Sequence, residues 1–294
     1  MNIYKRIYTI KSGKNKLNSF IDISTGRQLR VVFNILVDWK GFRSLLDLSL
    51  YGLSKESASI ISSHNQIAFS GGYEDRTALL FHGEIINVQK ERHGPDAVTR
   101  IYARSGPAGL AKSTISKTLG EGAPLPEVIK ACADAMSLPL IVNGIEPGVA
   151  FSGGYTLFGD PKKHLAELSK THRFDWVVEN NKLVVVGNKS KRPGKAHRIS
   201  MLTGMEGSPE ITGGGKTEVE AKVKVRLNPG IKIGQLFEII SEYPRANFSG
   251  VYYNNIPKTV GEGTYKVHRI EHSGDSHGDE WSTKLTGLRF LNNE

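Results

Sequence analysis

The sequence predicts a mainly β protein in which two tube-like antiparallel β-barrel domains flank a small α+β domain. Alternating, β-branched segments fill the first and last thirds of the chain, whereas helical spacing appears only in the middle third. The strands of the first third also recur in the same order in the last third. We place the N-terminal barrel at 1–106, the α+β domain at 107–189, and the C-terminal barrel with a basic linker at 190–294.

The first third consists of strand-like segments separated by turns. Residues 27–39 are β-rich, 47–54 alternate and end at a turn, and 65–73 run into glycines. Residues 77–106 predict a long hairpin, because two β-branched and aromatic arms flank the turn-forming cluster ERHGPD.

The middle third carries two predicted helices and a hairpin. In 124–138, apolar residues fall at helical spacing and Pro126 suits the first turn. In 159–172, Asp160 is expected to cap a helix that begins with Pro161. The segment 176–186 predicts a hairpin that turns at Asn180 and Asn181.

The last third returns to strands. In 217–227, apolar residues alternate with Glu218, Glu220, Lys222, Lys224 and Arg226, so one face is predicted to be apolar and the other charged. Residues 263–290 predict a second long hairpin. Each outer third therefore has an alternating strand, a following strand and a long hairpin, in that order.

The composition limits the function classes. The chain has 294 residues, of which 38% are hydrophobic and 23% charged, as in an ordinary globular protein. Its one cysteine, Cys132, falls at an apolar position of the first predicted helix, which indicates a small core residue and excludes a disulfide framework. No run of about 18 apolar residues exists, so we expect no membrane span. The N-terminus lacks the apolar core of a signal peptide, so we expect the chain to stay where it is made.

The net charge of +10 is concentrated in two places. Residues 1–45 carry nine Lys or Arg against two Asp, and 187–198 carry five Lys or Arg and no acid. Such clusters can steer nucleic acid, but no aromatic residues accompany the second one, which is interpreted as a solvated hinge.

No segment predicts a catalytic, cofactor-binding or metal-binding residue. GGGKT at 213–217 lacks the first glycine of a phosphate loop, since Glu210 stands there, and it precedes a strand. EHSGDSHGDEW at 271–281 gathers possible ligands without zinc or calcium spacing, and His164 and His172 have no third partner nearby. We therefore expect no cofactor and no enzymatic activity.

The pentapeptide FSGGY occurs at 69–73 and 151–155, with FSGVY at 248–252. The copies do not hold equivalent places among the predicted strands. Each is interpreted as an aromatic packing residue beside glycines that permit a tight turn.

Several long segments together resemble baseplate hub proteins of contractile-tailed bacteriophages. They appear in the expected order over nearly the whole chain. They are LSLYGLSKESASII (48–61), NQIAFSGGYEDRTALLFHGEI (65–85), GEGAPLPEVIKACADAMSL (120–138), GDPKKHLAELSKTHRFDWVVENNKLVVV (159–186), TGMEGSPEITGGGKTEVEAKVKVRLNPGIKIGQLFEI (203–239) and YKVHRIEHSGDSHGDEWSTKLTGL (265–288).

The resemblance implies a structural, non-enzymatic subunit of a homotrimer. Three copies would present six similar barrels around a channel for DNA, joining the six-fold tail tube to the three-fold central spike. Its partners would be the tail tube or a tube-initiator protein, the spike and other baseplate subunits. The location would be the virion tail baseplate, assembled in the bacterial host cytoplasm. The channel and interface residues stay unassigned.

Two other function classes remain open at this stage. A tail-associated peptidoglycan hydrolase would use paired carboxylates, whose separation in space the sequence does not give. A basic nucleic-acid-binding module would use the positively charged N-terminal region and linker.

Overall fold

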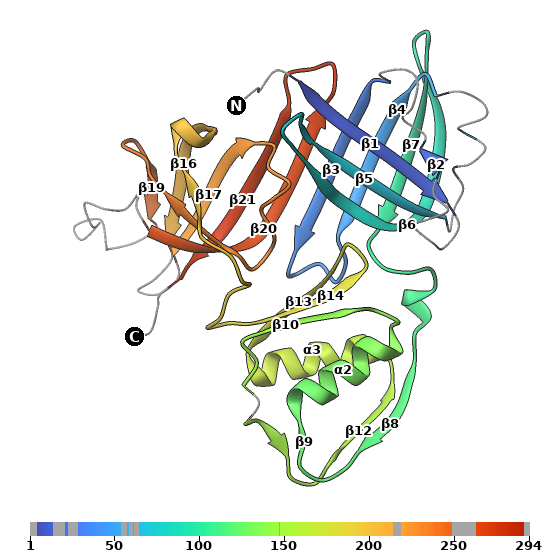
Figure 1. Cartoon of the computed structure of the whole chain (residues 1–294), viewed down its shortest axis with the longest axis vertical. Coiled ribbons are helices and arrows are strands. Elements are labelled where there is room, and N and C mark those ends of the chain that lie inside the picture. Colours follow the sequence, from blue (N-terminus) through green and yellow to red (C-terminus); the bar gives the residue numbers. More distant parts are fainter. Residues whose placement is uncertain are drawn as a thin grey trace.

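A computed structural model describes residues 5–13, 21–22, 29–53, 58, 61, 65–146, 148–213, 219–248 and 263–290. Its main feature is a 14-stranded sheet to which both outer thirds of the chain contribute (Figure 1). The strands of the N-terminal half are β1 Arg6–Gly13, β2 Ile21–Asp22, β3 Val31–Asp38, β4 Leu45–Tyr51, β5 Gln66–Tyr73, β6 Arg76–His93 and β7 Asp96–Arg104. Those of the C-terminal half are β15 His197–Ile199, β16 Met205–Gly213, β17 Val219–Arg226, β18 Leu236–Ile239, β19 Arg245–Phe248, β20 Gly263–Asp275 and β21 Trp281–Arg289.

The middle of the chain forms a separate α+β region below this sheet (Figure 1). Its elements are β8 Ile115–Leu119, β9 Ala123–Pro124, α2 Leu125–Ala135, β10 Leu140–Asn143, β11 Ala150–Phe151, β12 Tyr155–Gly159, α3 Pro161–His172, β13 Phe174–Glu179 and β14 Lys182–Gly187. Two short 3₁₀ helices are η2 Leu110–Lys112, which precedes β8, and η3 Met201–Thr203, which lies between β15 and β16 of the large sheet. The mainly β fold with a small α+β insert is thus confirmed.

The two halves of the large sheet repeat the same strand order. The N-terminal half runs β3-β4-β7-β6-β5, and the C-terminal half runs β16-β17-β21-β20-β18. Every neighbouring pair in one series is antiparallel, as is its counterpart in the other. The repetition of strands and hairpins predicted from the sequence is therefore confirmed.

The halves are joined edge to edge. β3 of the N-terminal half pairs with β20 of the C-terminal half, from Val32 opposite Asp275 to Asp38 opposite Arg269. The two halves consequently share one sheet rather than standing as separate bodies. Among the described strands, no pairing closes either half into a ring, so barrel closure and the domain boundaries at 106 and 189 stay predictions.

One apolar core runs through both halves, and strands such as β3, β4 and β17 bury every second side chain in it. At the junction, the Phe33 ring lies 4.7 Å from that of Phe69 and 5.2 Å from that of Trp281. The Trp281 indole N–H also donates to the Gly72 carbonyl at 3.1 Å. Trp281 of the C-terminal hairpin is therefore a core residue of the N-terminal half.

The predicted helices are confirmed. In α2, Leu125, Val128, Ile129 and Cys132 are buried at helical spacing, and burial raises the pKa of the Cys132 thiol to about 12. The Asp160 side chain caps α3 by accepting a hydrogen bond from the Lys162 amide at 2.9 Å. Cys132 is thus the core residue that its position in the sequence indicates.

The β13–β14 hairpin separates the two cores. Val177, Val184 and Val186 pack into the core of the large sheet, whereas the intervening Val178, Leu183 and Val185 pack against α2 and α3. Because both faces are buried, β14 is a continuous apolar run rather than an alternating one.

The tip of this hairpin anchors the α+β region to the N-terminal half. Asn180 and Asn181 both have left-handed backbone angles, as the predicted turn requires. The Asn181 side-chain amide donates to the Gln66 side-chain oxygen at 2.9 Å, and its oxygen accepts from the Gly106 amide at 2.6 Å. The Asn181 backbone N–H donates to Ser105 Oγ at 2.9 Å.

The basic linker also has a structural role. Most of its residues are exposed, as expected of a hinge, but the Arg192 side chain is 14% exposed. It lies 2.7 Å from the Glu179 carboxylate and donates to the Ile233 carbonyl at 3.1 Å. The interpretation as a purely solvated hinge is therefore wrong at Arg192, which fixes the α+β region to the C-terminal half.

The three copies of the pentapeptide lie in different settings. The first forms the end of β5, and the second spans the turn between β11 and β12. In the third, Phe248 ends β19 and the remaining residues lie outside the described part of the chain. The two copies that are fully described hold different structural places.

We expect Asn181→Gly to lower the free energy of unfolding by about 2 kcal/mol, because Gly keeps the left-handed backbone but removes the buried hydrogen bonds. Denaturant unfolding measures this change. Asn180→Gly is the matched control, since it alters the same turn at a side chain whose buried oxygen has no hydrogen-bond partner. Equal losses from both substitutions would show that the Asn181 hydrogen bonds do not anchor the region.

His272, which pairs with Ile35 across the junction, should make stability depend on pH. Burial, with a smaller contribution from the charge of Lys232, lowers the pKa of this histidine to about 3. The unfolded chain binds a proton here below about pH 6.5. The contribution of His272 to stability is therefore complete above that pH and is lost progressively as the pH falls towards 3.

His272 should make the free energy of unfolding of the wild type fall by about 1.4 kcal/mol for each pH unit between pH 6 and pH 4. We expect His272→Asn to lose this part of the slope. Denaturant titrations at stepped pH values measure the slope. His277→Asn, at an exposed turn position, controls for the loss of a histidine. Parallel slopes for His272→Asn and the wild type would contradict the prediction.

Candidate functional site

The face of the large sheet opposite its core is polar and charged. Directly paired residues point to the same side of a sheet, so this face can be followed from strand to strand across both halves. Charged residues on this face include Asp38, Asp47, Glu206, Glu210, Glu220, Glu271 and Asp275, with Arg100, Arg104, Lys222, Lys224, Arg226, Arg269 and Lys284. None of these side chains is buried, and acids and bases are interspersed. We call this surface the charged face.

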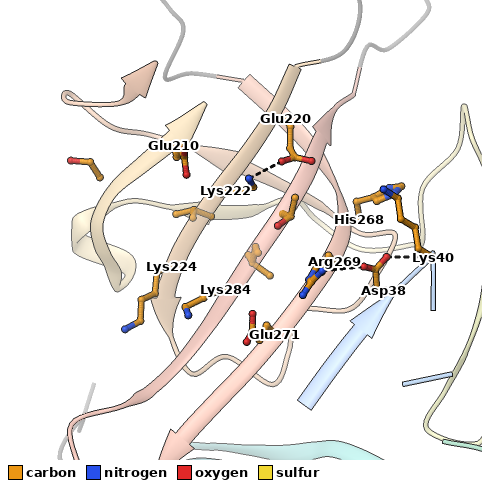
Figure 2. A pocket seen from close by; sticks show the side chains of 14 residues that line it. Asp38, Lys40, Glu210, Glu220, Lys222, Lys224, His268, Arg269, Glu271 and Lys284 are labelled. Carbon is orange, nitrogen blue, oxygen red and sulfur yellow. Dashed lines mark hydrogen bonds and ion pairs between the residues drawn. The ribbon is translucent and has the colours of Figure 1, made fainter. Parts of the chain in front are cut away.

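A hollow of about 600 Å³ lies on the charged face where the two halves meet. Figure 2 shows its lining, with Glu210, Lys222 and Lys284 from the C-terminal half and Asp38 and Lys40 from the end of β3. Most of the lining comes from the C-terminal half, and Asp38 and Lys40 of the N-terminal half complete it at the junction of β3 and β20.

Acids and bases of the charged face pair across neighbouring strands. The Arg269 guanidinium lies 3.5 Å from the Asp38 carboxylate, which links β20 to β3. Arg100 and Asp47 form a two-point contact at 3.0 and 2.7 Å between β7 and β4. The Lys224 ammonium lies 3.3 Å from the Glu206 carboxylate on β16. Such cross-strand pairs fix the strand register while leaving little unpaired charge.

The pKa shifts keep these groups charged at neutral pH. The hydrogen bond to Glu280 is the main cause that raises the pKa of Lys224. Burial raises the pKa of Glu280, but hydrogen bonds from Ser282, Lys224 and Ser273 outweigh it and lower the pKa to about 2. The hydrogen bond to Asp47 likewise raises the pKa of Arg100.

A second hollow, of about 510 Å³, lies beside the first and is less polar. Its lining includes Leu36, Leu45 and Ile86 next to Asp47 and Arg269. Leu45 is 42% exposed and Ile86 is 41% exposed, so this hollow has partly apolar walls.

The polar residues at the C-terminal hairpin turn do not converge on a ligand. His272 is buried and hydrogen bonds to Thr283, whereas the Asp275 carboxylate receives the Arg30 guanidinium at 3.2 and 2.7 Å. The His277 imidazole hydrogen bonds to Ser276 at 2.9 Å. Within the described ranges, no group of three or more His, Cys, Asp or Glu side chains could hold a metal ion.

The other candidates are also separated. His164 hydrogen bonds to the Phe158 backbone, and the His172 ring packs edge-on against Phe151. Gly213 ends β16, and the remainder of GGGKT lies outside the described residues. In the parts of the chain that the structure describes, no helix is long and apolar enough to cross a membrane.

Comparison with known families decides the identity. The sequence profile of the family described as baseplate hub gp41 matches residues 44–250. The chain belongs to this family. It is a structural component of a phage tail baseplate, and the resemblance seen in the sequence is confirmed. No curated protein matches it in sequence.

Solved structures show that this hub shares its fold with other tail proteins. The 43 kDa tail protein of prophage MuSo2 from Shewanella oneidensis has a TM-score of 0.64 at 13% identity, with 97% of this chain and 98% of that chain covered. A tail protein from Neisseria meningitidis MC58 has a TM-score of 0.60 at 9% identity, with 96% of each chain covered.

A third similar structure comes from a secretion machine. It is an E. coli component of the type VI secretion system, described as similar to the T4 bacteriophage tail proteins gp27 and gp5. The TM-score is 0.53 at 10% identity, and the alignment covers 91% of the hub and 76% of that chain. The fold therefore occurs in phage tails and in a type VI secretion system component.

The sequence alone left the channel and interface residues unassigned. The alternation in 217–227 already placed Glu220, Lys222 and Lys224 on one face, and the structure puts all three on the charged face. The missing information was the partner of β3, because a single strand does not reveal which distant strand continues its face.

Proposed function

We propose that three copies of this hub form a ring whose charged faces line a central channel for DNA. The continuity of the sheet supports this proposal. Two repeated halves already lie side by side and present one polar surface, so each chain supplies two similar units to a ring. The domain boundaries at 106 and 189 belong to this proposal.

The charge balance of the charged face suits the passage of DNA. An excess of Lys and Arg would bind phosphates and retain the strand, whereas an excess of acids would repel it. Here acidic and basic side chains are interspersed, and ion pairs such as Arg100–Asp47 neutralise several of them. The surface is therefore hydrophilic without being strongly adhesive.

In the proposed assembly the hub is a non-enzymatic adaptor. It connects the six-fold tail tube, or a tube-initiator protein, to a three-fold central spike and contacts other baseplate subunits. Assembly takes place in the cytoplasm of the bacterial host. The family match supports the structural role, since it identifies a baseplate hub.

The ring is tested by imaging the purified hub. We expect electron microscopy of concentrated protein, or of isolated baseplates, to show a closed ring of three chains with six similar lobes around an opening. Analytical ultracentrifugation gives the mass of the same sample. A ring of another copy number, or baseplates in which the hub lies away from the axis, would contradict the proposal.

The charged face is tested with a variant in which Glu206, Glu220 and Glu271 are changed to Gln. We expect the wild type to bind a short DNA duplex weakly. The variant should bind about tenfold or more tightly at low salt, with a steeper salt dependence, because three positive charges are no longer balanced. Fluorescence anisotropy against salt concentration measures both.

The matched control changes Glu121, Glu127 and Glu146 to Gln in the α+β region, which alters the net charge equally. If both triple variants gain the same affinity, the increase comes from overall charge rather than from the charged face.

A further inference from the structure

A third hollow, of about 560 Å³, lies in the α+β region, and none of its lining residues belongs to the charged face. Four segments meet around it, namely the start of α2, the segment after β10, the end of α3 and the segment after β14. A space of this size is typical of a binding site for a small molecule or for a few residues of a polypeptide. The proposed ring makes no use of it.

The apolar part of the lining is the less exposed part. Leu125 is buried, and Ile145 and Val149 are half-buried. These aliphatic side chains line a hollow and do not project from the surface. They can therefore receive an apolar side chain but are not placed to insert into a lipid surface.

The exposed part of the lining is mainly basic. Arg173 and Lys189 are exposed and His172 is half-buried, whereas Glu146 is the one acid among the described residues that line the hollow. In the described part of the chain, neither Arg173 nor Lys189 forms an ion pair. Unlike the bases of the charged face, which have acids on neighbouring strands, these two keep their positive charge available to a ligand.

The backbone at Arg173 supplies an independent observation. Arg173 follows α3 directly and has left-handed angles, with φ 55° and ψ 62°. Glycine is the usual residue at such a helix end, because a side chain makes the left-handed conformation less favourable. The chain therefore keeps a side chain here at a cost to stability, and that side chain lines the hollow.

Close backbone contacts fix the wall next to Lys189. A Cβ atom on Gly144 would stand 1.8 Å from Ser190 Oγ, and one on Gly187 would stand 2.2 Å from the Gly144 carbonyl oxygen. Only glycine permits these approaches, so the segments that follow β10 and β14 hold each other in place. The hollow therefore has a wall of fixed shape.

We propose that this hollow binds an acidic, extended segment of another baseplate protein. An apolar side chain of the segment packs against Leu125, Ile145 and Val149. A carboxylate of the segment binds Arg173 and Lys189, since guanidinium and ammonium groups form strong hydrogen bonds to carboxylate oxygens. The inference rests on the proposed adaptor role and names a surface for one of its contacts.

The composition of the lining favours a polypeptide over nucleic acid. None of the described lining residues is Phe, Tyr or Trp, so the hollow offers no platform on which bases could stack. A single strand of nucleic acid would also need a continuous basic groove, whereas Glu146 interrupts the basic residues here.

Binding of labelled peptides tests the chemistry. The probe is a fluorescent hexapeptide of alternating glutamate and leucine, compared with peptides that carry lysine for glutamate or serine for leucine. We expect the purified hub to bind the probe about tenfold or more tightly than either comparison peptide, measured by fluorescence anisotropy. Free glutamate that displaced the probe at equal concentration would identify a small carboxylate as the ligand and overturn the polypeptide assignment. A short DNA duplex that bound as tightly at this site would overturn it too.

Two variants locate the site. We expect Arg173→Gly and Lys189→Gln each to weaken binding of the probe by about tenfold, since each removes a charge-assisted hydrogen bond. Arg173→Gly should not lower the denaturant midpoint, because glycine fits the left-handed backbone. Lys163→Gln, in the first turn of α3, controls for net charge. Ser137→Gly controls for the backbone, since Ser137 follows α2 with φ 55°.

The variants also have outcomes that contradict the inference. Equal weakening in Lys163→Gln would show that the probe responds to net charge rather than to the hollow. Unchanged probe binding in Arg173→Gly, with a lower denaturant midpoint, would show that Arg173 serves only the end of α3.

Cross-linking in isolated baseplates identifies the source of the segment. A carbodiimide joins lysine amines to carboxylates that contact them, so we expect Lys189 to become linked to an aspartate or glutamate of another baseplate protein. Mass spectrometry of the digested product maps the link, and Lys163 should give none. Links from Lys189 only to Glu146 of its own chain would overturn the inference.

The inference and the proposed ring fail in different experiments. Baseplates that contain the ring of three chains, but show no link from Lys189 to another protein, would overturn the peptide site alone. Baseplates without that ring would overturn the ring, while probe binding that Arg173→Gly abolishes would still support the site.

Discussion

Backbone pairing between β3 and β20 is the interaction on which the rest of the hub depends. It joins segments far apart in the chain, as the hydrogen bond from Asn34 to Glu271 across 237 residues shows. With this pairing, Trp281 reaches the Gly72 carbonyl and the charged face continues from one half to the other. Without it, each half would expose a row of unpaired backbone groups, which is a liability at a sheet edge.

The same alternation of side chains supplies both the core and the charged face. Because consecutive residues point to opposite sides, a slip of one residue would place Arg269 and Glu271 in the core and Ile270 on the surface. The cross-strand ion pairs and the buried aromatic cluster of Phe33, Phe69 and Trp281 therefore enforce the same register from opposite faces. The core and the charged face therefore depend on the same strand register.

Local patterns in the sequence predicted most helices and strands, whereas contacts between distant parts of the chain were harder to predict. The Asp160 cap, the Asn180–Asn181 turn and the alternation through β17 are determined by neighbouring residues, and the structure confirms each. The order of strands also revealed the repeat. The pairing of β3 with β20 was not predictable from one sequence, since many strands have compatible apolar patterns. The burial of Arg192 against Glu179 was missed for the same reason, because its partner comes from another region.

The long-range pairing also has a consequence during synthesis of the chain. β20 and β21 come from residues 263–289, so β3, which ends at Asp38, stays without this partner until more than 200 further residues have been translated. The α+β region, whose contacts are mainly within its own segment, can form its core earlier. During that interval the edge of β3 that will later pair with β20 is exposed. A strand of a neighbouring nascent chain could pair with this edge instead. Hubs made on the same messenger would therefore be exposed to mispairing until β20 has emerged from the ribosome.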